Sequence, residues 1–236
     1  MSAKHQYFYP CKDLTSPEER KMLVDLAHKM LPLTSEKINS VLQNEFKNSV
    51  YQEEIDDWKT RNNLSKNAAE SAEQFVAKWV EYNPNWSAIN KPIITKLFGD
   101  VYIDIIETVV KRYGGDGWRV MLSHDDTSQL PIHSDPKIGP QSNLNLPLYP
   151  DYAFYRPTNY HKSYDRNDIV CSVDYKVLRS PCLLNMGKLH SAGDFEQPTN
   201  EHYNGKSVSI QIMFLGKYAD TMKSFQSKGW LSTTFS

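Results

Sequence analysis

Apolar residues in the first half of the chain recur at the three- and four-residue spacing of amphipathic helices. Ser16 followed by Pro17 and two acidic residues is typical of a helix start, and Pro32 is expected to end that first helix. The same spacing predicts further helical stretches at 35–46, 75–80 and 91–113. The last of these has the widest apolar face, and Gly114 supplies its stop.

After Gly117 the pattern changes to short apolar runs separated by prolines and turn residues, which is typical of strands. The strands we expect are 118–123, 130–133, 143–148, 153–155, 169–175, 182–186 and 207–215. Helices followed by strands predict an α+β fold, and this many strands suits a small β-sandwich or jelly roll. We therefore divide the chain into a mainly helical region 1–115, a β-rich core 116–217 and an extension 218–236 that adds a short helix.

Composition narrows the class of protein without naming a function. The 236 residues carry 27 basic and 28 acidic side chains, so the net charge does not indicate a DNA-binding protein. A nucleic acid is not excluded as a partner. Cys11, Cys171 and Cys182 are an odd number with no close spacing, which argues against a disulfide framework and favours the reducing cytoplasm. No apolar run is long enough to predict a membrane span.

Two histidines and one carboxylate are placed where they could share a metal ion. His133 and Asp135 are two residues apart, so in extended backbone both side chains point to the same side. An apolar, proline-led strand ends in His190, within the same β-rich region. A short His/Asp pair with a distant second histidine is the composition of the facial triad that holds iron(II) and leaves three coordination positions open.

The order of these motifs resembles the double-stranded β-helix core of the 2-oxoglutarate/iron(II)-dependent dioxygenases, most closely the compact bacterial and phage members. It comprises the His133-x-Asp135 pair, the Asn-Leu-Asn-Leu-Pro-Leu run at 143–148, the distal His190 and a final strand at 207–214. The likeness covers the β-rich core and implies a jelly roll braced by the N-terminal helices. We expect a cytoplasmic protein, in the host cytoplasm if a phage encodes it.

The resemblance implies a function as well. His133, Asp135 and His190 would be the iron(II) ligands and catalytic centre, and 2-oxoglutarate would be the co-substrate that is decarboxylated to succinate. The primary substrate would be a peptide, a nucleobase or a small molecule that is hydroxylated or demethylated. The sequence names neither this substrate nor the oligomeric state.

One position departs from the family pattern. Members usually carry an arginine on the last core strand, two residues before a serine or threonine, to clamp the far carboxylate of 2-oxoglutarate. Aligning on Ser209 puts Ser207 there. Three cations could replace the arginine: Lys206, Lys188 and Arg119. We favour Lys206, which a bulge would have to turn toward the interior. Asn145, on the strand after the His/Asp pair, is expected to face the pocket.

Two other interpretations remain open. The missing arginine favours a jelly-roll structural or binding protein with a relict site, or a cupin-like metalloenzyme that does not use 2-oxoglutarate. The segment 149–168 concentrates aromatic and basic residues. It could form a substrate wall or cover the edge of the sandwich.

Overall fold

The computed structural model describes residues 3–34, 36–38, 40–41, 86–89, 91–123, 130–135, 140–152, 155–192 and 206–232. Within these ranges the helices are η1 (Ala3–Gln6), α1 (Pro17–Met30), α5 (Lys91–Phe98), α6 (Val101–Tyr113), α7 (Tyr175–Leu178) and α8 (Tyr218–Ser227). The strands are β1 (Phe8–Pro10), β2 (Trp86–Ile89), β3 (Gly117–Ser123), β4 (Leu130–His133), β5 (Ser142–Tyr149), β6 (Thr158–His161), β7 (Ile169–Val173), β8 (Cys182–Asn185), β9 (His190–Ala192) and β10 (Ser207–Phe214).

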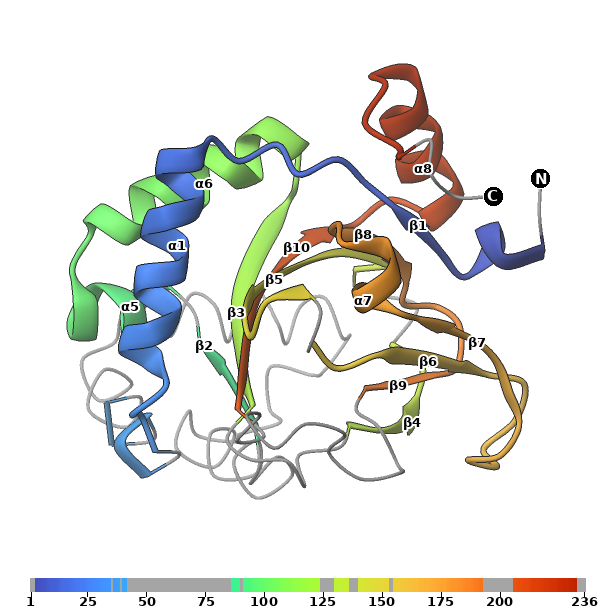
Figure 1. Ribbon diagram of the computed structural model, residues 1–236, viewed down its shortest axis with the longest axis horizontal. Helices are drawn as coiled ribbons and strands as arrows, with labels where there is room; N and C mark the ends of the chain where they lie inside the picture. Colours follow the sequence, from blue (N-terminus) through green and yellow to red (C-terminus); the bar gives the residue numbers. More distant parts are fainter. Residues whose placement is uncertain are drawn as a thin grey trace, which may run out of the picture.

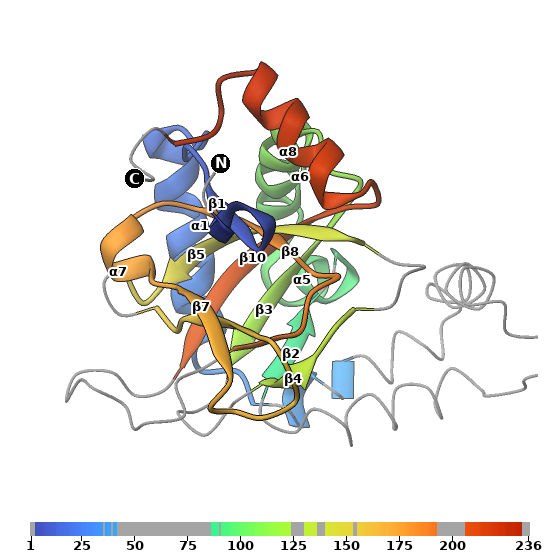
Figure 2. The same ribbon diagram turned by 90° about the vertical axis from the view of Figure 1, so that its right-hand side faces the viewer.

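The strands form two antiparallel sheets (Figure 1). The larger has the order β1-β8-β5-β10-β3-β2, and the smaller has the order β4-β9-β6-β7. Helices α1, α5 and α6 lie on one side of the larger sheet, away from the smaller one (Figure 2). The predicted α+β class is therefore confirmed.

Eight strands, β3 to β10, pair as if one long antiparallel ribbon had been folded over. The outermost pair is β3 with β10, and β4 with β9, β5 with β8 and β6 with β7 follow. Along the ribbon the pairs alternate between the two sheets. This arrangement brings β4 and β9, which are far apart in sequence, side by side.

Local sequence accounts for the helix boundaries. The hydroxyl of Ser16 accepts from the backbone N–H of Glu19, and the Glu19 carboxylate accepts from the N–H of Ser16, which completes a capping box for α1. Gly114, at a φ of 71°, ends α6 in the left-handed region. A second left-handed glycine, Gly99 at 89°, splits the single helix expected at 91–113 into α5 and α6.

No helix among the described residues is long and apolar enough to cross a membrane.

The helices pack on the larger sheet through a core that we call the helix-side core. Leu23 of α1 and Ile106 of α6 are buried there against Val120 of β3, Leu146 of β5 and Ile210 of β10. Because side chains alternate along a strand, the neighbours of these sheet residues face the smaller sheet instead. The larger sheet therefore has one apolar face under the helices and a second face turned toward the interior.

A second, smaller core fills part of the space between the sheets, and we call it the inter-sheet core. It joins Phe8 and Leu184 of the larger sheet to Tyr160 and Val173 of the smaller sheet, with Tyr175 beside them. This core closes one part of the interior with aromatic and aliphatic groups.

The N-terminal region is less helical than the pattern indicates, because β1 and β2 extend the larger sheet at its two edges. Both are short, at three and four residues, so neither offers enough alternation to be recognised. Residues 36–38, 40 and 41 are helical as expected, whereas the helix expected at 75–80 lies outside the described residues.

The β-rich region contains two strands, β6 and β9, that the pattern does not predict. All four side chains of β6 are buried, so its mixture of polar and aromatic residues shows no alternation between an exposed and a buried face. The strand expected at 153–155 is not seen at Tyr155, which lies in a bend, and its other residues are outside the described part. The strand expected at 169–175 ends at Val173, because Asp174 caps α7.

Gly115, between α6 and β3, lies so close to the sheet that a side chain would not fit. An ideal Cβ there would be 2.3 Å from Cγ2 of Ile212, inside the helix-side core. We expect Gly115→Ala to lower the free energy of unfolding by about 1–3 kcal/mol, measured by urea denaturation. Gly216→Ala, whose Cβ would meet its nearest neighbour at 3.8 Å, should change it far less. Equal effects of the two variants would contradict this packing argument.

Candidate metal site

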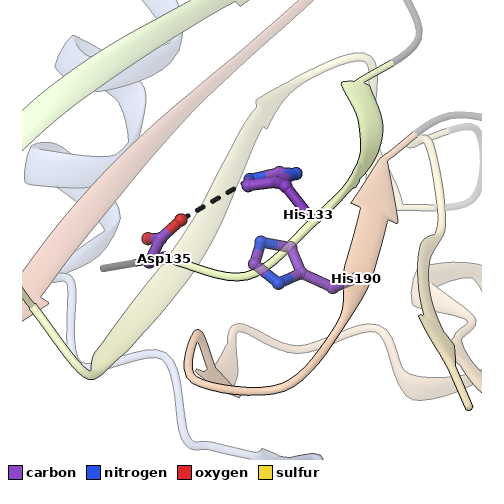
Figure 3. A group of neighbouring side chains, drawn as sticks. All are labelled: His133, Asp135 and His190. Carbon is purple, nitrogen blue, oxygen red and sulfur yellow. Dashed lines mark ion pairs between the residues drawn. The ribbon is translucent and has the colours of Figure 1, made fainter. Parts of the chain in front are cut away.

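Two side chains from paired strands and one from the residues just beyond β4 lie close together (Figure 3). His133 ends β4 and lies directly opposite His190, the first residue of β9. Asp135 follows two residues after His133. One ligand atom from each of the three lies within 4.8 Å of the others, so His133, Asp135 and His190 could hold one metal ion.

The ligand atoms are somewhat farther apart than those of a bound triad. Nε2 of His133 is 3.5 Å from Oδ1 of Asp135, and the ring centroids of His133 and His190 are 4.3 Å apart. Ligand atoms on one face of an ion, each about 2.1 Å from it, lie about 3 Å from one another. Side-chain rotation could therefore bring the three groups onto one ion.

His190 is held in the tautomer that a metal ligand needs. Its Nδ1 is 2.8 Å from the carbonyl oxygen of Lys188, which can only accept, so Nδ1 carries the proton. Nε2 then carries no proton and has a lone pair available. That atom is buried and has no hydrogen-bond partner in the described part of the chain. A backbone carbonyl that orients the distal nitrogen is the usual support of a metal-binding histidine.

The charges of the site are also suited to a cation. Burial, followed by the neighbouring His133, lowers the pKa of His190 to about 4, so its imidazole is neutral at pH 7. Burial raises the pKa of Asp135, but hydrogen bonding to His133 and the nearby positive charges outweigh this, and the net pKa lies below its ordinary value. The site thus offers one carboxylate and a neutral imidazole.

The backbone after β8 fixes both Asp135 and His190. The N–H of Asp135 donates to the carbonyl of Met186 at 2.9 Å, and the N–H of Met186 donates to that of Gln141. A turn closed by Asn185, whose side-chain oxygen accepts from the N–H of Gly187, then leads into β9. The expectation that His190 ends the strand beginning near Cys182 is therefore wrong. That strand stops at Asn185, and His190 opens a new strand in the other sheet.

Arg119, one of the three cations considered for the co-substrate, faces the interior. It lies on β3 beside Val120, whose side chain belongs to the helix-side core, so Arg119 points to the opposite face. Its Nε donates to Oε1 of Gln211 on β10 at 2.8 Å, and the two residues are register partners. Burial lowers the pKa of this guanidinium, and the Asp135 carboxylate acts in the opposite direction. Arg119 therefore interacts electrostatically with the triad.

Asn145 and Ser209 also lie on the inner face of the larger sheet. Asn145 is the register partner of Gln211 on the side opposite Arg119, and its Nδ2 donates to the hydroxyl of Tyr175 at 2.8 Å. Its Oδ1 and the hydroxyl of Ser209 are buried without a hydrogen-bond partner among the described residues. The structure thus places both residues in the interior.

Asn143 is an interior residue that the sequence argument did not single out. It is 1% exposed, and neither atom of its amide finds a hydrogen-bond partner within the described ranges. The signal was present in the sequence, since Asn143 and Asn145 alternate with Leu144 and Leu146 and so share one face.

Lys206 lies away from this group. Its Nζ donates to the carbonyl of Leu31 at 2.6 Å, and Leu31 packs against the helix-side core. The first described residue of β10 after it, Ser207, is buried and pairs with Ser123 of β3. Of the residues considered for the co-substrate, the structure brings Arg119, Asn145 and Ser209 to the interior and directs the Lys206 ammonium to α1.

The aromatic segment 149–168 is largely structural where it is described. Tyr160 is fully buried in the inter-sheet core, and Tyr152 and Tyr155 pack against that core. Tyr164 is the exposed exception. Most of the rings described in this segment therefore pack in or against the core between the two sheets.

No protein-family model matches the chain, and no curated protein matches it either.

Proposed function

We propose that this chain is an iron(II)- and 2-oxoglutarate-dependent oxygenase that hydroxylates or demethylates a peptide, nucleobase or small-molecule substrate. The observation that carries the proposal is the convergence of His133, Asp135 and His190. These residue types are the ones that bind iron(II) in facial triads. The buried, unprotonated Nε2 of His190 has no hydrogen-bond partner in the described part of the chain.

The residues present fit the ion. His133, Asp135 and His190 would hold it, and two imidazoles with one carboxylate leave positions for further ligands. Bound there, iron(II) would supply the coupled oxidation of 2-oxoglutarate to succinate and CO₂ and of a substrate C–H bond to an alcohol by one O₂. The Lys188 carbonyl would keep His190 in its binding tautomer, and Asp135 would supply the negative charge.

The strand pairing supports the finer fold assignment. A ribbon of eight strands folded over into two sheets is the arrangement of a jelly roll, and β3 to β10 pair in that pattern. We propose that these strands are the double-stranded β-helix and that α1, α5 and α6 brace its larger sheet.

Arg119 is the residue that best suits the far carboxylate of 2-oxoglutarate. Its guanidinium, on the neighbouring strand β3, would take the place of the arginine expected at position 207. The side chain of Gln211 on β10 accepts a hydrogen bond from Arg119 and orients it. A guanidinium binds a carboxylate through two parallel hydrogen bonds. Asn145 and Ser209 would add hydrogen bonds from the same face.

Anaerobic addition of iron(II) and 2-oxoglutarate to the metal-free protein tests this function. We expect the visible metal-to-ligand charge-transfer band of the chelated oxo-acid to appear with the native protein and to vanish in His190→Ala. Succinate formation under air then gives a readout for candidate substrates. A native protein that binds neither iron nor the oxo-acid would contradict the proposal and favour a structural or binding jelly roll.

The second candidate function is a metalloprotein that does not use 2-oxoglutarate. Serine at position 207, where the family carries its arginine, is the observation that favours it. If the native protein binds iron but no charge-transfer band appears on addition of 2-oxoglutarate, this alternative is supported.

A further inference from the structure

The turn between β8 and β9 supports two of the three candidate metal ligands. The carbonyl of Met186 accepts from the backbone N–H of Asp135 at 2.9 Å. The carbonyl of Lys188 is 2.8 Å from Nδ1 of His190 and keeps the proton on that atom. A shift of this turn would therefore move the backbone of Asp135 and release the tautomer of His190. Groups that hold the turn in place also hold these two ligands.

Asn185 closes this turn from its first position. Its Oδ1 accepts from the N–H of Gly187 at 3.2 Å, and its carbonyl accepts from the N–H of Lys188 at 3.4 Å. An asparagine side chain that bonds to the backbone two residues further on stabilises a turn in this way. The carboxamide thus fixes the peptide units whose carbonyls hold Asp135 and His190.

The donor side of the same carboxamide is tied to residues 6–10, which we call the N-terminal segment. Nδ2 of Asn185 donates to the carbonyl of Gln6 at 2.8 Å, across 179 residues of sequence. The backbone N–H of Asn185 donates to the carbonyl of Tyr7, also at 2.8 Å. One side chain therefore joins the beginning of the chain to the turn that supports the candidate metal site.

An aromatic contact follows the same route. Tyr160 is fully buried, and its ring centroid is 5.3 Å from that of Tyr7 and 6.2 Å from that of His190. Its hydroxyl accepts from the N–H of Asn185 at 3.0 Å, and Tyr160 is the register partner of His190. The phenol thus contacts the N-terminal segment, the turn and a candidate ligand at once. Burial strengthens such a hydrogen bond, because little water competes for it.

We propose that the N-terminal segment supports the candidate metal site and that Asn185 is the positioning residue through which it acts. The inference rests on the proposed function only for its effect on iron binding. Its effects on His190 and on the N-terminal segment belong to the metal-free protein. Asn185 is not a catalytic residue, because the contacts described above join it to backbone groups and to the hydroxyl of Tyr160.

The first test measures iron(II) affinity in the full chain. Asn185→Leu removes both hydrogen bonds of the carboxamide at nearly constant volume. Anaerobic competition with a chromophoric chelator should show binding weakened by about tenfold or more, because loss of a group behind a metal ligand typically costs 10- to 100-fold. The matched control is Asn167→Leu, the same change in the exposed loop between β6 and β7, which should bind iron as the native protein does.

The second test needs no metal. Nitrogen-15 NMR at pH 7 reports which ring nitrogen of His190 carries the proton. We expect Nδ1 in the native protein and in Asn167→Leu, because the Lys188 carbonyl accepts from it. In Asn185→Leu this carbonyl is released, and the tautomer with the proton on Nε2 should become populated. A merely structural role of Asn185 would lower stability and leave the tautomer of the folded protein unchanged.

Hydrogen exchange tests the tie to the N-terminal segment. The N–H of Cys11, just beyond that segment, donates to the carbonyl of Pro181 at 2.7 Å. It should exchange faster in metal-free Asn185→Leu than in the control, because the segment opens more often. The N–H of Gly114, at the end of α6, is the internal reference. Faster exchange at both sites would mean a general loss of stability and would contradict the proposed tie.

A milder variant keeps the inference testable if Asn185→Leu does not fold, as far-ultraviolet circular dichroism would show. Asn185→Asp keeps the acceptor for Gly187 and loses the donor to Gln6, so it should speed exchange at Cys11 by a smaller factor. Native exchange at Cys11 in this variant would overturn the tie.

The outcomes separate this inference from the proposed function. A native protein that binds no iron(II) contradicts the proposed function, and the tautomer and exchange measurements then decide the inference alone. If the native protein binds iron(II) and folded Asn185→Leu binds it equally, the inference is overturned while the proposed function stands. An unchanged His190 tautomer in that variant overturns the inference as well.

Discussion

The free energy of unfolding of the metal-free protein is expected to fall by about 3 kcal/mol as the pH drops from 6.5 to 4, because of His190 alone. Its pKa moves from 6.5 to about 4 in the folded protein, mainly because the ring is buried. Each pH unit between the two values is worth about 1.4 kcal/mol. The unfolded chain takes up a proton in this range while the folded protein does not, so stability is fully present above pH 6.5 and is lost as the pH falls.

His190→Asn removes the titrating ring and keeps a donor that can reach the Lys188 carbonyl. Urea unfolding with a chelator, repeated across this pH range, should therefore show a flatter dependence for the variant than for the native protein. Parallel loss of stability in both proteins would mean that His190 is not the group responsible.

Asp135→Asn is expected to weaken metal binding by more than about a hundredfold. Asp135 is the only carboxylate of the triad, and loss of a group that merely supports a ligand already costs 10- to 100-fold in metal affinity. Anaerobic competition between the protein and a chromophoric chelator for iron(II) measures the change.

The matched control is Asp165→Asn, in the exposed loop between β6 and β7. Asp165 accepts from the N–H of Asn167, and asparagine can make the same turn contact. Its metal affinity should equal that of the native protein. If Asp135→Asn also binds iron as the native protein does, Asp135 is not a ligand and the proposed function fails.

The candidate metal site was predictable to the extent that its signals are local. The two-residue spacing of His133 and Asp135 is visible in the sequence, and their side chains do lie together. His190 was identified as the third member, but the strand that carries it was not, because the turn at Gly187 sits inside an apolar run. Periodicity does not show where such a run changes sheets.

The choice between Lys206 and Arg119 required the register of the strands. Arg119 lies within a predicted strand and Lys206 directly before one, and the sequence alone does not show which of the two cations faces the triad. Gln211 pairs with Arg119 across 92 residues of sequence. Long-range pairing of this kind follows from the fold and not from the local pattern. The short edge strands β1 and β2 were missed for a similar reason, since their pairing partners are distant.

The candidate metal ligands and the inward-facing polar groups belong to different sheets. His133 and His190 are register partners on β4 and β9 of the smaller sheet, with Asp135 just beyond β4. Arg119, Gln211 and the two asparagines belong to strands of the larger sheet. In the proposed function, mutations that alter the inward-facing polar groups of the larger sheet can therefore accumulate while the candidate metal ligands stay unchanged. Such a separation would let the proposed oxygenase acquire new specificities in evolution while His133, Asp135 and His190 are retained.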